Sequence, residues 1–151
     1  MFFLEKIIFF EFVNQDMKKI INQLRRELRR NSDLSVKISS QRFFKEKIKV
    51  YGVPASVVAK ISKTFNREIL ALDKKTVFAL SEELWRSGYL EEAIIACQWS
   101  YLIRKKYQPA DFKIFEKWVN CYVTNWATCD TLGNHTTGTF IEMYPDYVKE
   151  L

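Results

Sequence analysis

The chain has 151 residues, of which 48% are hydrophobic, enough to bury the core of one ordinary domain and too few residues in all to favour two. Its 4 glycines and 3 prolines argue against turn-rich β-sandwich and barrel folds and against long low-complexity linkers. The formal net charge is +6, but residues 1–75 carry 17 Lys and Arg against 8 Asp and Glu, whereas residues 76–151 carry 7 against 10. A basic half fits a surface that binds a polyanion, although cations that only solvate helix faces would give the same distribution.

Residues 1–13 form an apolar N-terminal extension, MFFLEKIIFFEFV. Three charged residues interrupt it, and it is shorter than the roughly 20 residues that a membrane-spanning helix needs. It also lacks the basic start and the cleavage site of a secretory signal. We therefore expect no membrane partner and interpret the extension either as an extra packing segment or as a stretch upstream of the true start.

The three cysteines, Cys97, Cys121 and Cys129, form no close CxxC pair, and His135 is the single histidine. This pattern is typical of a reducing compartment, so we expect a cytoplasmic protein whose thiols are small buried side chains. A metal site built from the two later cysteines with Asp130 and His135 would match no standard zinc spacing. We expect neither a metal nor a cofactor.

Apolar residues at helical spacing predict a series of amphipathic helices along the first half of the chain. The first is expected from residue 14 or 16 to about residue 30 and has a very basic exterior. A second is expected from residue 39 or 40 to Gly52, with Phe43 and Phe44 facing inward. A third should begin in the turn at Pro54 and run to about residue 65.

The second half of the chain carries clearer start and stop signals. Asp73 is the expected N-cap of a helix that the Ser87-Gly88 pair ends, and another helix should start near residue 90. Pro109 then breaks the chain before a helix over residues 112–122. A last helix is expected from residue 126 or 128 to Met143, with a proline as its terminator.

The predicted helices are joined in pairs by short turns. Successive pairs start at Asp73 and Asp111, 38 residues apart, which is the rhythm of HEAT-like helical repeats. We therefore predict an all-α fold in which HEAT-like αα-hairpin repeats form a short right-handed superhelix over residues 14–151.

Three stretches carry a resemblance to a known family. They are FFKEKIKVYGVP at residues 43–54, LWRSGYLEE at residues 84–92, and FEKWVN at residues 115–120 followed by NWATCD at residues 125–130. Together they resemble the AlkD-like DNA alkylation repair glycosylases, which excise alkylated purines with a superhelix of HEAT-like repeats. Relatives continue through several more helices, so the resemblance implies that this chain is truncated at the C-terminus. It also implies an exposed repeat face that a second copy or another chain would cover.

The resemblance places Trp126 and Asp130 in a DNA-binding cleft as the catalytic residues. Residues four apart share one helix face, so the indole and the carboxylate should project together. A carboxylate such as Asp130 can stabilise the positive charge that develops as a glycosidic bond breaks and can orient a water molecule. Trp126 would contact the deoxyribose or the cationic base and exclude solvent. The expected activity is release of 3-methyladenine or 7-methylguanine from double-stranded DNA.

Five cations are candidate DNA-binding residues: Lys60, Lys63, Arg104, Lys105 and Lys106. The last three end a helix, where cations also compensate the helix dipole, so their position alone does not assign a phosphate contact. Trp126 and Asp130, considered without the resemblance, would be a core aromatic residue and a solvated acid. The alternative function is a non-catalytic helical-repeat scaffold that binds DNA or a protein partner.

Overall fold

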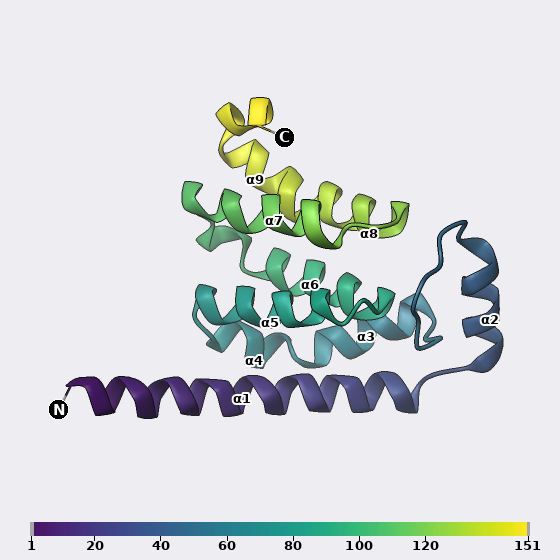
Figure 1. Cartoon of the computed structure of the whole chain (residues 1–151), viewed down its shortest axis with the longest axis horizontal. Coiled ribbons are helices and arrows are strands. Elements are labelled where there is room, and N and C mark those ends of the chain that lie inside the picture. Colours follow the sequence, from purple (N-terminus) through teal and green to yellow (C-terminus); the bar gives the residue numbers. More distant parts are fainter. Residues whose placement is uncertain (1, 151) are drawn as a thin grey trace.

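The computed structural model describes residues 2–150, which fold into stacked helices joined by turns and one longer loop (Figure 1). The helices are α1 (Phe2–Arg30), α2 (Leu34–Phe43), α3 (Ala55–Thr64), α4 (Asn66–Ala71), α5 (Lys74–Arg86), α6 (Leu90–Leu102), α7 (Phe112–Tyr122), α8 (Trp126–Thr131) and α9 (Gly138–Met143), with the 3₁₀-helices η1 (Arg104–Lys106), η2 (Pro109–Asp111) and η4 (Pro145–Glu150) and the π-helix η3 (Leu132–Thr137). α1 packs against α3 and α5, α6 contacts α3, α5 and α8, and α7 packs on α5. The predicted all-α fold of helical repeats is confirmed.

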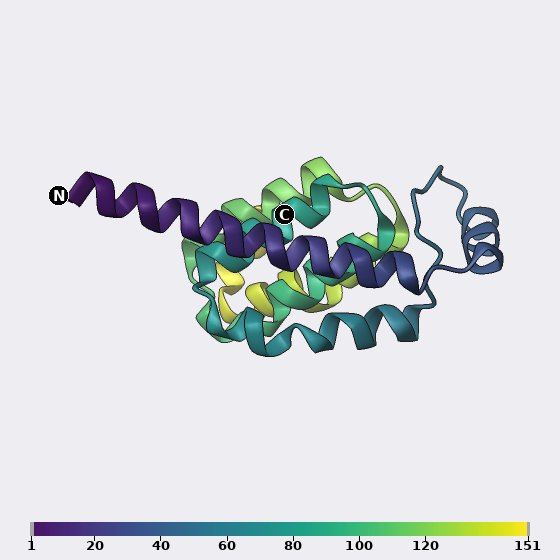
Figure 2. The ribbon, with the colours of Figure 1, turned by 90° about the horizontal axis from the view of Figure 1, so that it is seen from below.

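α1 starts at Phe2, well before the predicted start at residue 14 or 16. No glycine, proline or capping signal interrupts the apolar stretch, so the helix simply continues through it. Ile20, Ile21, Leu24 and Leu28 bury the face that packs on the body, as expected. The N-terminal turns extend past the body (Figure 2), and their described apolar side chains are exposed rather than packed. These side chains are Phe2, Phe3, Leu4, Ile8 and Phe12.

A search of the described helices found none that is both long enough and apolar enough to cross a membrane.

The predicted helix from residue 39 or 40 to Gly52 is wrong. The helix in this region is α2, which begins earlier because Asp33 caps it: the carboxylate accepts hydrogen bonds from the N–H groups of Ser35 at 2.7 Å and Val36 at 3.1 Å. It ends at Phe43, and none of its residues is buried. A loop over residues 44–54, hereafter the 44–54 loop, follows in place of the predicted helical turns.

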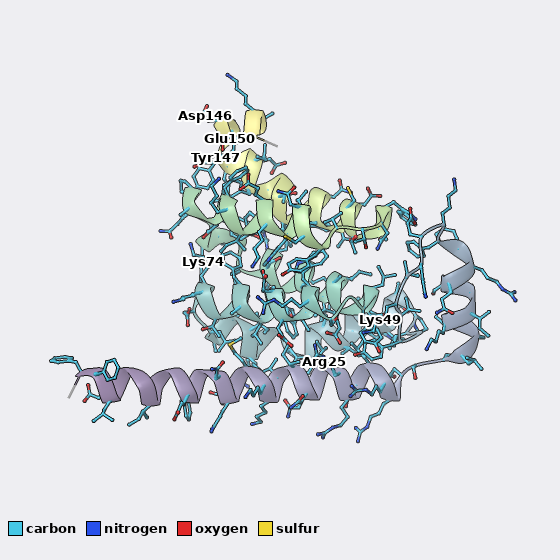
Figure 3. All side chains as sticks on the ribbon, viewed as in Figure 1. Arg25, Lys49, Lys74, Asp146, Tyr147 and Glu150 are labelled. Carbon is cyan, nitrogen blue, oxygen red and sulfur yellow. The ribbon has the colours of Figure 1, made fainter. Side chains whose placement is uncertain are left out.

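Two buried carboxylates hold the end of the 44–54 loop. Glu91, 4% exposed, accepts hydrogen bonds from the backbone N–H groups of residues 51–53 at 2.9–3.2 Å. Glu92, fully buried, accepts two 3.0 Å hydrogen bonds from the Arg25 guanidinium and one of 2.6 Å from the Tyr51 hydroxyl (Figure 3). The first turn of α6 therefore anchors both the loop and α1.

The predicted helix ends between residues 73 and 88 are confirmed. Asp73 caps α5 by accepting a 3.0 Å hydrogen bond from the N–H of Thr76, and the Thr76 hydroxyl holds the pKa of that carboxyl below its ordinary value. Gly88, with φ of +73°, follows the end of α5 in the left-handed region that favours glycine. The short helix α4 was not predicted.

Three of the four tryptophans, Trp85, Trp99 and Trp118, are buried packing residues, as expected. Beside them, Glu82 joins α5 to α7 by accepting hydrogen bonds of 2.6 Å from the Trp118 indole and the Tyr122 hydroxyl. Its carboxylate also lies 2.6 Å from the Lys117 ammonium. These contacts fix the spacing of α5 and α7.

The last predicted helix is present as one continuous run from Trp126 to Met143, made of α8, η3 and α9. Its middle is wound as a π-helix, which the sequence did not indicate. Thr136 in this segment faces inward and lies 3.0 Å from the Ser100 hydroxyl of α6. The π-helical turn therefore brings a polar side chain to a polar group of the core.

Candidate functional site

Trp126 and Asp130 lie one turn apart on α8, which begins at a well-defined cap. Asn125 accepts a 3.0 Å hydrogen bond from the N–H of Thr128 and fixes the start of the helix. Thr128 and Leu132 turn into the core, whereas Trp126 is 52% exposed and Asp130 is also exposed. The structure therefore leaves both proposed catalytic side chains open to solvent on the side of α8 turned away from the core.

The Trp126 indole is held by two phenylalanines at the end of α2. Its ring stacks on Phe44 with centroids 5.5 Å apart and planes at 16°, and the edge of Phe43 approaches at 5.8 Å. Phe43 is 70% exposed and Phe44 is partly exposed, so the prediction that both face inward is wrong. We call these three rings the aromatic platform. The resemblance drew attention to the stretch that begins at Phe43, but nothing in the sequence placed it beside Trp126.

The structure does not bring Arg104, Lys105 and Lys106 to the aromatic platform. They form η1 after the end of α6, whereas Trp126 begins α8 near the start of α6. A helix of 13 residues separates the two ends by roughly 20 Å. The Arg104 guanidinium lies 4.4 Å from the Tyr101 ring centroid, and that ring also contacts the imidazole of His135 at 5.3 Å.

Lys60 and Lys63 are exposed on α3, which packs on α6. The cations nearest the platform are different ones that the sequence analysis did not single out. Lys47, Lys49 and Arg86 line a pocket together with Asn125 and Thr128, the residues on either side of the Trp126 turn. Their positions in a loop and at a helix end gave no periodic signal.

The cysteines follow the prediction only in part. Cys97 is buried, and burial raises the pKa of its thiol well above the ordinary value. Cys121 and Cys129 are exposed because they flank the turn between α7 and α8. Among residues 2–150, no three His, Cys, Asp or Glu side chains gather where a metal ion could bind. Cys121, Cys129, Asp130 and His135 thus do not form a ligand set.

The layered helical pairs and the exposed Trp126 and Asp130 on an inner helix define the chain as a helical-repeat protein with a solvent-facing aromatic and acidic site. The model of the DNA alkylation repair enzyme family matches residues 24–151, and the chain belongs to that family. The match covers α2 to η4, the last helical turns of α1, and both proposed catalytic residues. No curated protein and no solved structure matches the chain.

Proposed function

We propose that the protein releases cationic alkylated purines, such as 3-methyladenine and 7-methylguanine, from double-stranded DNA by hydrolysis of the N-glycosidic bond. The observation that carries this proposal is the joint exposure of Trp126 and Asp130 one helical turn apart. Membership in the DNA alkylation repair enzyme family supports the repair role. The choice of substrate follows from the chemistry that an indole and a carboxylate can perform together.

The carboxylate of Asp130 makes no hydrogen bond or ion pair with another described residue, so it is free to face a substrate. In the proposed reaction the bond from C1′ to the base nitrogen breaks, and its electron pair neutralises the departing cationic base. A water oxygen bonds to C1′, and its proton passes to Asp130 and then to solvent. A fixed negative charge stabilises the positive charge that develops on the sugar.

The Trp126 indole offers its π-face to a cation, an interaction worth about 0.5–2 kcal/mol depending on desolvation. A neutral damaged base lacks this attraction and has a stronger glycosidic bond. The proposed site therefore selects for the charge of the lesion rather than its shape. Equal release of neutral and cationic damaged bases would contradict this selectivity.

The decisive experiment incubates methylated duplex DNA with the protein and measures free base. Asp130→Asn should lower the single-turnover rate about 100- to 1000-fold, the usual effect of removing one group that stabilises transition-state charge. DNA affinity should be retained or increased because a negative charge is lost. Asp146→Asn makes the same charge change on η4 and is the matched control. Unchanged release by Asp130→Asn would disprove the catalytic assignment.

Phe44 is proposed as a positioning residue that holds the Trp126 ring. Aromatic pairs contribute about 0.5–1.5 kcal/mol beyond buried area, so Phe44→Ala should lower base release two- to tenfold. Because the other three tryptophans are buried, acrylamide quenching of fluorescence reports mainly on Trp126 and should increase in this variant. Phe12→Ala, at an exposed ring on α1, is the control and should change neither quantity.

The second candidate is a non-catalytic repeat scaffold that binds DNA, which the positive charge of residues 1–75 supports. It predicts salt-dependent DNA binding and no base release whatever residue occupies position 130. A partner chain that covers the C-terminal end of the stack stays a prediction; Met143 and Val148 are exposed apolar residues in that region.

A further inference from the structure

A pocket of about 360 Å³ lies beside the aromatic platform, and we call it the lysine pocket. It is formed by the 44–54 loop, the turn between α5 and α6, and the turn between α7 and α8. The residues that matter for the argument are Lys47, Lys49, Trp85, Arg86, Cys121 and Asn125. Its volume is in the range of roughly 300–1000 Å³ that small-ligand sites occupy.

The charge of the lysine pocket is positive. Lys47, Lys49 and Arg86 line it, and none of its lining residues is acidic. Arg86 has a distant acidic neighbour outside the lining, Glu82 at 3.7 Å, and its side chain remains 60% exposed. Three cations without a neutralising carboxylate in the lining favour an anion over a neutral or cationic ligand.

The walls of the lysine pocket are preorganised. The Lys49 ammonium donates a 3.1 Å hydrogen bond to the Ser87 carbonyl and lies 4.1 Å from the Tyr89 ring centroid (Figure 3). The Lys49 carbonyl accepts a 2.9 Å hydrogen bond from the N–H of Leu90, which ties the loop to the start of α6. The positive charge is thus held in place before any ligand binds.

The Trp85 indole gives a second indication of a ligand. Trp85 lines the pocket, is 3% exposed, and its Nε1–H has no hydrogen-bond partner among the described residues. Buried donors without an acceptor are uncommon in folded proteins. An oxygen-rich anion that displaces a neighbouring side chain would supply the missing acceptor.

The pocket adjoins the position that the proposed function gives to the lesion. Asn125 and Thr128, on either side of the Trp126 turn, form part of its wall, and Lys47 lies three residues after Phe44 of the platform. In a DNA strand each nucleotide is flanked by phosphates. We propose that the lysine pocket binds the backbone phosphate next to the nucleotide that Trp126 contacts, an inference that rests on the proposed function and adds a phosphate site to it.

The first test measures the affinity for unmodified duplex DNA over a range of salt concentrations. Loss of one phosphate contact should reduce the slope of log K against log salt by about 0.9. The variant Lys47→Gln/Lys49→Gln should show this reduction. Lys19→Gln/Lys113→Gln removes the same charge from α1 and α7, away from the pocket, and should keep the wild-type slope. Equal slopes for the pocket variant and the wild type would overturn the proposal.

The second test needs no variant and uses the exposed thiol of Cys121 in the pocket wall. Duplex DNA should slow the reaction of Cys121 with a maleimide, and inorganic pyrophosphate should slow it while leaving Cys129 unaffected. Protection by pyrophosphate but not by DNA would overturn the proposal and identify a site for small phosphates. No protection by either would also overturn it.

These tests are separable from the test of catalysis because both use unmodified DNA. If no base is released but the salt slope and the Cys121 protection behave as expected, the catalytic proposal fails and the phosphate site stands. If base release depends on Asp130 but the Lys47→Gln/Lys49→Gln variant binds DNA with the wild-type slope, only the phosphate site fails.

Discussion

Replacing Glu91 by alanine should destabilise the protein strongly and disturb the aromatic platform. The Glu91 carboxylate accepts three backbone hydrogen bonds, and those from Gly52 and Val53 are buried. Each buried N–H left without an acceptor costs about 1–3 kcal/mol, so the free energy of unfolding should fall by about 2–6 kcal/mol. At about 4 kcal/mol, the melting temperature of a domain of this size should fall by roughly 8–16 °C.

Urea and thermal unfolding measure this loss. Glu83→Ala removes a carboxylate that is 48% exposed and 3.6 Å from Arg25, so it should cost less than about 1 kcal/mol and serves as the control. Glu91→Gln keeps one acceptor oxygen and should fall between the two. Acrylamide quenching of Trp126 should increase in Glu91→Ala because the 44–54 loop carries Phe44. A loss below about 1 kcal/mol in Glu91→Ala would refute the role of the carboxylate as the anchor of the loop.

Two further predictions concern stability. Gly52→Ala should cost about 3 kcal/mol or more in urea unfolding, because φ is +91° and a Cβ would lie 2.5 Å from the Asp33 carbonyl oxygen; Gly88→Ala, with φ of +73° and open space, should cost only about 1–2 kcal/mol, and equal losses would contradict the steric argument. Burial by itself raises the pKa of Glu82, but hydrogen bonds from three α7 side chains outweigh it and hold that pKa below the ordinary 4.5. A lowered folded-state pKa stabilises the fold fully above the unfolded value, so the stability advantage of wild type over Glu82→Gln should be constant above about pH 5 and shrink as the pH falls below 4.5; a pH-independent difference would show that the carboxylate does not titrate with folding.

The parts of the fold that could be predicted depend on contacts within one turn of helix. Asp73 caps α5 through Thr76, three residues later, and Gly88 ends the same helix through its own backbone conformation. Both signals are complete within a short window of sequence. The buried faces of α1 and α7 followed from spacing for the same reason, since each helix packs one side on the body.

The errors arose where distant residues decide the structure. Asp33 was interpreted only as the end of α1, although the same residue also caps α2, and the apolar pair Phe43-Phe44 then suggested a buried face. Those rings are instead partly covered by Trp126, which lies 82 positions beyond Phe44. No local pattern reports such a contact, so the platform could not be predicted even though Trp126 itself could.

The candidate site is a product of both kinds of contact. The four-residue spacing of Trp126 and Asp130 placed both side chains on one face of α8, but the neighbouring cations were predicted on the wrong segments. Arg104, Lys105 and Lys106 attracted attention as a run of charge, whereas the cations that reach the platform are dispersed along the chain. Lys47, Lys49 and Arg86 meet only because the 44–54 loop lies against the turn between α5 and α6.

The position of the aromatic platform depends on the 44–54 loop more than on α2. α2 buries no residue, so it contributes little packing energy that could fix Phe44. The loop, in contrast, is fixed at Lys49 by the N–H of Leu90 and at residues 51–53 by Glu91. Stability of the core and geometry of the site are therefore coupled through the first turn of α6. Substitutions at that turn should change Trp126 exposure and the free energy of unfolding together, whereas substitutions on the exposed face of α2 should change neither.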